Sequence, residues 1–147
     1  MAQIKVKRVK VEDLKAYEQN PRRNSKAVGA VYESIKKFGF RNPIIINPDG
    51  VILAGNTRLE ALQKAGIDEV DCIELNHLTK EQENAFRIAD NRVADFSFWD
   101  KDLLEQEMME IGADDWKLFG FKDKDLEFLK APDQCTCPRC GKSFIKV

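Results

Sequence analysis

The stretch that decides the fold is IIINPDGVILAGNTRLEALQKA, from Ile44 to Ala65. Its two short apolar runs, 44–47 and 51–54, flank the turn-forming triplet Pro-Asp-Gly and predict two strands joined by a tight turn. A helical spacing of apolar residues follows over 57–65. Gly55 separates the second strand from this helix, so we expect the chain to bend sharply there.

This bend has a chemical consequence. Where a strand passes through a glycine into a helix, the first N–H groups of the helix lack intrahelical partners and point at one spot. The helix dipole makes that spot favourable for an anion. Arg58, in the first helical turn, adds a guanidinium that suits bidentate contact with phosphate. The sequence therefore predicts a phosphate-binding corner at residues 55–58.

Similar signals predict elements on both sides of this segment, and together they give a small mixed sheet with helices, hence an α+β fold. Hydropathy indicates strands over 4–11 and 69–75. Capping residues and glycine stops indicate a helix from Ser25 ended by Gly39, a helix over 79–94 opened by a Thr79/Gln82 capping box, and a helix capped by Asp100. An apolar segment over 116–121 is expected to fold back on the core, and a short helix runs from Asp123 to Lys130.

Size and composition fit one domain with an appendage. Of the 147 residues, 43% are hydrophobic and 33% are charged, which allows a packed core and a solvated surface. No apolar run approaches the roughly 20 residues of a membrane span, and the first residues lack the apolar region of a signal peptide. We therefore expect a cytoplasmic protein with no membrane partner.

The formal net charge of −1 does not indicate a dedicated nucleic-acid binder, but the charge is unevenly placed. Residues 1–41 contain eleven Lys or Arg and four Asp or Glu, whereas residues 95–129 contain four Lys and eleven acids. The basic head suits contact with nucleic acid or nucleotide phosphates. A solvated surface without such a role is the alternative.

The cysteines suggest a zinc-binding tail. Cys137 and Cys140 form a Cys-x-x-Cys-Gly turn of the zinc-knuckle type, and Cys135 offers a third ligand. The fourth would come from Cys72, His77, a water or another chain, and the last choice implies a homodimer across the metal. The alternatives are a reduced tail without metal and, less favoured, a redox pair. Cys72 lies in a predicted strand and is most simply a core residue.

The order of motifs resembles the ParB/sulfiredoxin-like domain, in particular the type found in phages and mobile elements near DNA methyltransferases. The motifs are NPR at 20–22, FGF at 38–40, NPIII at 42–46, GNTR at 55–58 and ADNR at 89–92. The resemblance implies a compact domain over 1–95, a helical extension over 96–130, and a linker with the zinc-knuckle-like tail over 131–147.

The resemblance also implies a nucleotide site that takes CTP or ATP with Mg²⁺. Its implied members are two residues of the basic turn, the four of the glycine loop and an asparagine on a later helix: Arg22, Arg23, Gly55, Asn56, Thr57, Arg58 and Asn91. Asp90 is the implied magnesium ligand, because hard oxygen ligands suit that ion.

Some residues depart from the family pattern. Asn56 and Thr57 replace a charged Glu-Arg pair, so one cation is missing from the phosphate loop. The loop also lacks the reactive cysteine of sulfiredoxins, which excludes that chemistry. Simpler interpretations exist for each candidate: a tight strand-to-helix connection at 55–58, solvated arginines in the basic turn, and an ordinary surface pair between Arg87 and Asp90 or its neighbour.

Two functions of different kinds follow. The first is a nucleotide-binding ParB-like module of phage or mobile-element origin that acts in DNA transactions as an accessory or switch protein. The second is a nucleic-acid or protein adaptor with a degenerate nucleotide site, which the missing cation favours. A magnesium-dependent NTPase, kinase or nuclease is a weaker alternative, and no nucleophile–base pair identifies a catalytic residue.

Overall fold

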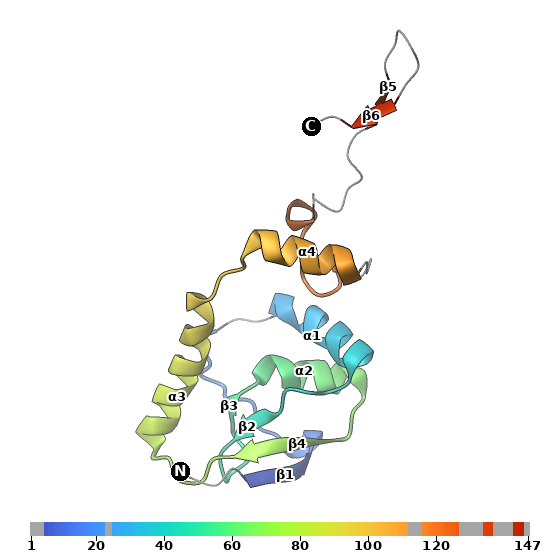
Figure 1. Ribbon diagram of the computed structural model, residues 1–147. Coiled ribbons are helices and arrows are strands. Elements are labelled where there is room, and N and C mark those ends of the chain that lie inside the picture. Colours follow the sequence, from blue (N-terminus) through green and yellow to red (C-terminus); the bar gives the residue numbers. More distant parts are fainter. Residues whose placement is uncertain (1–4, 23–24, 112–115, 127–133, 137–142, 146–147) are drawn as a thin grey trace. The chain divides into compact units, whose positions relative to one another are not determined.

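A computed structural model describes residues 5–22, 25–111, 116–126, 134–136 and 143–145 (Figure 1). The chain divides into two compact units. The first comprises Met1–Trp99 with Leu118–Gly120, and the second comprises Asp100–Lys117 with Phe121–Val147. The domain boundaries expected from the sequence stay predictions.

The first unit contains a four-stranded mixed sheet in the order β1-β4-β2-β3. Its strands are β1 (Lys5–Lys10), β2 (Ile44–Ile46), β3 (Ile52–Ala54) and β4 (Glu69–Glu74). β4 pairs antiparallel with β1 and parallel with β2, while β2 and β3 form an antiparallel pair. The parallel pairing requires a crossover connection between β2 and β4, and β3 with the helix that follows it provides this connection. The predicted small mixed sheet is confirmed.

Three helices complete this unit: α1 (Ser25–Phe38), α2 (Asn56–Ala65) and α3 (Lys80–Val93). Figure 1 shows α1 and α2 on the same side of the sheet, where they pack against each other, and α3 contacts β3. The predicted capping box is confirmed, because Thr79 Oγ1 accepts from the Gln82 N–H at 3.3 Å and Gln82 Oε1 accepts from the Thr79 N–H at 2.9 Å. Short 3₁₀ turns follow β1, at Val11–Asp13, and α3, at Ala94–Phe96.

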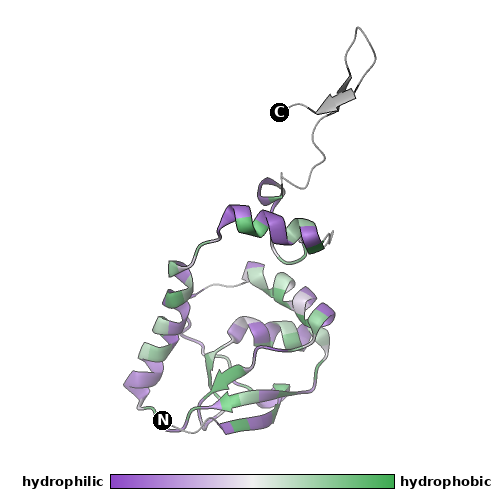
Figure 2. Cartoon of the chain, viewed as in Figure 1, coloured by the Kyte–Doolittle hydropathy of each residue, from purple (hydrophilic) through white to green (hydrophobic). Residues whose placement is uncertain are grey.

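The core lies between the sheet and helices α1 and α2, and hydrophobic residues follow the sheet strands in Figure 2. Its buried members are Val11, Leu14, Ile35, Ile44, Ile46, Ile52, Leu59, Ala61, Leu62, Val70 and Cys72. Cys72 is fully buried, as predicted. Burial raises the pKa of its thiol, and the nearby Asp71 adds to the shift. This cysteine is therefore a core residue rather than a reactive thiol.

α3 is attached to the sheet through buried polar groups. Glu83 and Arg87 are only 6% and 5% exposed, and their side chains approach to 3.5 Å. Glu83 Oε1 also accepts a 3.1 Å hydrogen bond from Asn47, whose own Oδ1 accepts from the N–H groups of Asp49 and Val51 in the β2–β3 turn. One carboxylate thus ties the helix to the predicted Pro-Asp-Gly turn.

The second unit contains α4 (Lys101–Ile111) and a 3₁₀ turn at Asp123–Asp125. Asp100 caps α4 as predicted, since its Oδ1 accepts from the Leu103 N–H at 3.2 Å. The helix predicted from Asp123 is described only as this short turn, and residues 127–130 lie outside the described part. Strands β5 (Gln134–Thr136) and β6 (Ser143–Ile145) pair antiparallel. No helix in the described part is long and apolar enough to cross a bilayer.

The apolar segment 116–121 divides between the units. Phe119 belongs to the first unit, where its ring centroid lies 5.7 Å from that of Phe38 on α1. Because Phe38 is 55% exposed, this contact lies at the surface of the helix and not in the buried cluster. Trp116 and Phe121 belong to the second unit and form an edge-to-face pair at 6.2 Å. The part of the segment that returns to the first unit is Leu118–Gly120.

The buried ion pair gives a stability prediction. Arg87→Met removes the buried partner of Glu83, which keeps only the exposed Lys80 at 3.5 Å, and Glu83→Gln removes the carboxylate beside Arg87. Each should lower the free energy of unfolding by up to about 3–5 kcal/mol. The double variant should be destabilised by less than the sum, because neither charge remains. Arg92→Met is the control: its partner Asp95 is exposed, so its loss should be about 1 kcal/mol or less. Urea unfolding measures the free energy of unfolding of the four variants. Equal decreases for Arg87→Met and Arg92→Met would contradict the structural role of the buried pair.

Candidate functional site

Gly55 forms the predicted corner between β3 and α2. Its φ of 116° and ψ of 24° lie in the left-handed region, which side chains rarely adopt. A Cβ atom there would lie 3.2 Å from Ile44 Cγ1 and 3.4 Å from Arg58 Cζ. With no side chain at the N-cap, no cap hydrogen bond covers the first N–H groups of α2, those of residues 56–58. The sharp bend is confirmed, and phosphate binding there stays a prediction.

Arg58 lies over this corner. Its Nη1 donates to the backbone carbonyls of Pro43 and, at 3.3 Å, Asn42. Partial burial lowers the pKa of the guanidinium, and the carboxylate of Asp90 opposes that shift. Among the described residues, no protein acceptor engages Nε or Nη2 of Arg58. The guanidinium is thus anchored through one nitrogen and keeps two for a ligand.

Asn56 connects the corner to the loop before α1. Its Oδ1 accepts a 3.3 Å hydrogen bond from the backbone N–H of Tyr17. A cavity of about 260 Å³ lies beside it, lined by Ala16, Tyr17, Glu18, Asn20, Arg22, Ser25, Asn56 and Glu60. Two predicted site residues, Arg22 and Asn56, therefore face one hollow. Two glutamates share it, so the surroundings of the helix N-terminus are not uniformly positive.

Arg22 joins the same loop to the end of α3. Its Nη1 donates to the backbone carbonyl of Asn91 at 2.8 Å, and its Nη2 lies 3.6 Å from Asp95. The Asn91 side chain points back into its own helix and donates to the carbonyl of Arg87 at 2.8 Å. Arg22 and Asn91 are thus in direct contact, although they are far apart in the sequence.

Asp90 lies on α3 near Arg58, whose charge it influences. Its side chain is exposed and forms no hydrogen bond or ion pair with another described residue. Within the described ranges, no three His, Cys, Asp or Glu side chains gather in a way that would hold a metal ion. A lone carboxylate beside a phosphate site still fits Mg²⁺, which takes most of its ligands from water and phosphate oxygens.

The interpretation of Arg87 as part of an ordinary surface pair with Asp90 or Asn91 is wrong. Arg87 is buried, and its side chain contacts Glu83, Asn84 and the carbonyl of Ile52 instead of Asp90 or Asn91. The spacing of three or four residues along the helix fits both outcomes, and only the packing of β3 on α3 decides between them.

Three candidate residues lie outside the described part of the chain: Arg23, Cys137 and Cys140. Cys135 lies in β5.

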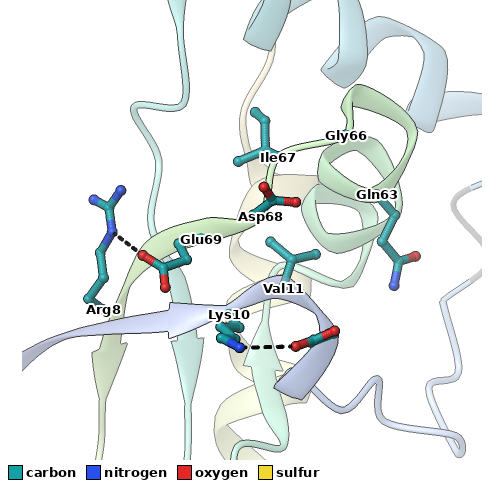
Figure 3. A pocket seen from close by; sticks show the side chains of 9 residues that line it. Arg8, Lys10, Val11, Gln63, Gly66, Ile67, Asp68 and Glu69 are labelled. Carbon is teal, nitrogen blue, oxygen red and sulfur yellow. Dashed lines mark hydrogen bonds and ion pairs between the residues drawn. The ribbon is translucent and has the colours of Figure 1, made fainter.

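A second hollow in the first unit lies elsewhere. About 860 Å³ in volume, it lies at the opposite end of α2, beside Gly66 and the ends of β1 and β4 (Figure 3). Its two cations each pair with a carboxylate, Arg8 with Glu69 at 3.7 Å and Lys10 with Glu12 at 3.4 Å. The hollow lies at the C-terminal end of α2, where the helix dipole disfavours an anion, so we place the candidate site at the Gly55 corner.

Tyr17 is the residue that sequence reasoning missed. It combines the bond to Asn56 with a stacked contact, since its ring centroid lies 3.9 Å from Cζ of Arg87. The only local signal was an aromatic residue three positions before the Asn-Pro-Arg turn. That position does not predict a contact with a helix about seventy residues later in the chain.

Comparison with known proteins agrees with the sequence motifs and the sheet. The family model of the ParB N-terminal domain matches residues 1–92, more than half of the chain. The chain belongs to the ParB N-terminal domain family. A 73-residue stretch is 40% identical to the ParB-like nuclease domain-containing protein YnaK of Escherichia coli K12 and covers 49% of this chain and 84% of that protein.

Solved ParB structures share the fold. The C-terminally truncated chromosome-partitioning protein ParB from Caulobacter crescentus, complexed with CTP-gamma-S, matches with a TM-score of 0.60 at 21% identity, over 84% of this chain and 69% of that one. The Pnob8-like ParB-N domain matches with a TM-score of 0.52 at 21% identity, over 97% of this chain and 57% of that one. The predicted family is confirmed; association with phages or methyltransferases is not shown by these comparisons.

The corner gives a second stability prediction. Gly55→Ala should lower the free energy of unfolding by about 1–3 kcal/mol, because the left-handed backbone is strained for alanine and the new methyl meets Ile44. Gly29→Ala is the matched control. It lies inside α1 with open space around the added carbon, so it should be neutral or stabilising by up to about 1 kcal/mol. Denaturant unfolding compares the two, and a Gly55→Ala variant as stable as the unsubstituted protein would rule out a constrained corner.

Proposed function

We propose that this chain is a nucleotide-binding ParB-like module that acts in DNA transactions as an accessory or switch protein. The observation that carries the proposal is the Gly55 corner, where the first N–H groups of α2 have no side-chain cap and two nitrogens of Arg58 have no acceptor among the described residues. The family supports it, as does the shared fold with a ParB whose structure contains CTP-gamma-S. An origin in a phage or mobile element is part of the proposal and rests on the sequence motifs.

Each candidate residue would have its own role in binding a nucleotide. The backbone N–H groups of Asn56 and Thr57 and the guanidinium of Arg58 would bind phosphate oxygens, because all three favour negative charge at one place. Arg22 would approach from the loop, with Arg23 beside it in sequence. Magnesium, when bound, neutralises phosphate charge, and Asp90 would be its protein ligand. Asn91 keeps Arg22 near the site through its backbone carbonyl.

Thermal unfolding with nucleotides tests this proposal. CTP or ATP with Mg²⁺ should raise the melting temperature, because binding at a hundredfold excess over the dissociation constant adds about 2.7 kcal/mol of stability. Arg58→Ala should abolish the shift. Arg8→Ala is the control, because it removes an exposed cation, paired with Asp71, from β1, the strand farthest from β3. This variant should show the same rise in melting temperature as the unsubstituted protein. No shift with any nucleotide at millimolar concentration would reject the proposal.

The adaptor with a degenerate site has an observation of its own. Glu18 and Glu60 line the hollow next to Asn56, and their negative charge opposes a triphosphate. The same thermal series separates the two functions: an adaptor gives no nucleotide shift, and its affinity for DNA falls steeply with salt. Release of ADP, or nicking of plasmid DNA, that disappears in Asp90→Ala would instead identify the NTPase, kinase or nuclease alternative.

We also propose that the C-terminal tail binds Zn²⁺ through Cys135, Cys137 and Cys140. β5 and β6 pair antiparallel on either side of residues 137–142, with Cys135 opposite Phe144. Protein purified without added zinc should contain about one equivalent per chain, or about half an equivalent where two chains share the ion. Cys137→Ser should lose it. Elemental analysis decides, and less than half an equivalent in the unsubstituted protein rejects both forms.

A further inference from the structure

Arg87 is a buried cation that the proposed site does not use directly. Its guanidinium donates from three nitrogens: Nη1 to Asn84 Oδ1 at 2.7 Å, Nε to the Ile52 carbonyl at 3.3 Å, and Nη2 to Glu83 at 3.5 Å. Ile52 begins β3, the strand that leads into Gly55. The side chain is therefore held in one place relative to the strand that supports the corner.

The face of the same guanidinium carries Tyr17. Cζ of Arg87 lies 3.9 Å from the ring centroid, within the range of a cation–π contact. The backbone N–H of Tyr17 donates to Asn56 Oδ1, on the first residue of α2. Moving the tyrosine ring would therefore move the backbone that orients Asn56 at the phosphate corner.

Two turn bonds extend this support along the loop. The Tyr17 carbonyl accepts from the Asn20 N–H at 3.2 Å, and Asn20 Oδ1 accepts from the Arg22 N–H at 3.2 Å. The far end of the loop is fixed to α3 by Arg22 and Asn91. Loop 15–22 is thus held at Tyr17 by a side chain and at Arg22 by a backbone carbonyl of the same helix.

We infer that Arg87 is a positioning residue of the nucleotide site, which acts by stacking on Tyr17 and so holds Asn56 and Arg22 in place before a nucleotide arrives. This inference rests on the proposed function. The physical reason is preorganisation: a loop that must be ordered at the moment of binding lowers the affinity, whereas a loop already held does not. Arg87 itself, buried beneath Tyr17, needs no contact with the ligand.

Calorimetric titration with CTP and Mg²⁺ tests the inference. Arg87→Met and Tyr17→Leu should each weaken binding about tenfold, which corresponds to about 1.4 kcal/mol. Tyr17→Phe keeps the stacked ring and should bind within twofold of the unsubstituted protein. Glu83→Gln is the control for lost stability: it disturbs the same buried pair, but Nη1 and Nε of Arg87 keep their bonds to Asn84 and the Ile52 carbonyl. Arg87 should therefore stay against Tyr17, and the affinity should change less than twofold.

A second measurement does not depend on the ligand. Hydrogen exchange over residues 15–22 should be faster in Arg87→Met and Tyr17→Leu than in Glu83→Gln, in protein without nucleotide. If the unsubstituted protein binds CTP and these two variants bind it equally well, the inference is overturned and the proposed function survives. If the unsubstituted protein binds neither CTP nor ATP, the proposed function fails and the inference with it.

Discussion

The contact between the backbone at Gly55 and the side chain of Ile44 constrains the rest of the first unit. Ile44 is fully buried in β2, and a Cβ atom on Gly55 would lie only 3.2 Å from its Cγ1. Only glycine adopts this left-handed conformation without strain, so β3 reaches its last buried residue and α2 begins immediately. The close approach that seals the core is also what leaves the first N–H groups of α2 uncapped. Stability and the proposed anion binding therefore depend on the same residue.

α3 reverses the usual arrangement of an amphipathic helix. Its buried side chains are Glu83 and Arg87, while Ile88 and Val93 are more than 60% exposed. A helix held by apolar contacts alone can shift along its neighbour with little change in energy. A helix held by hydrogen bonds to the Ile52 carbonyl and to Asn47 loses specific bonds when it shifts. The polar attachment thus fixes where the end of α3 lies relative to the corner.

The sequence predicts most of the elements because their signals are local. The turn after β2, the capping box at Thr79 and the glycine at position 55 each depend on residues a few positions apart. The candidate site is less predictable. Its loop and glycine corner were recognised from motifs, but the burial of Arg87 depends on β3 and on Tyr17, far away in the chain. A helical spacing of three or four residues cannot reveal such a contact.

The same limit applies to the hydrogen-bond partners of Arg22 and Arg58, the two candidate-site arginines in the described part of the chain. Nothing local indicates that Arg58 donates to the carbonyls of Asn42 and Pro43, or that Arg22 reaches Asn91. These contacts arise from where the strands and helices end. Motifs therefore gave the candidate residues, whereas the tertiary packing determines which nitrogens of Arg22 and Arg58 have protein acceptors.

That availability orders the events of binding. Arg58 keeps two nitrogens without protein acceptors in the described part of the chain, so an arriving oxyanion displaces only water from them. Arg22 is engaged by Asp95, but at 3.6 Å and with both side chains over 40% exposed this ion pair contributes little. If the proposed function holds, a phosphate held at Arg58 would draw Arg22 from Asp95 while the bond to the Asn91 carbonyl persists. Asp90, near Arg58, would oppose the phosphate until a cation neutralised its charge, and nucleotide and magnesium binding would then depend on each other.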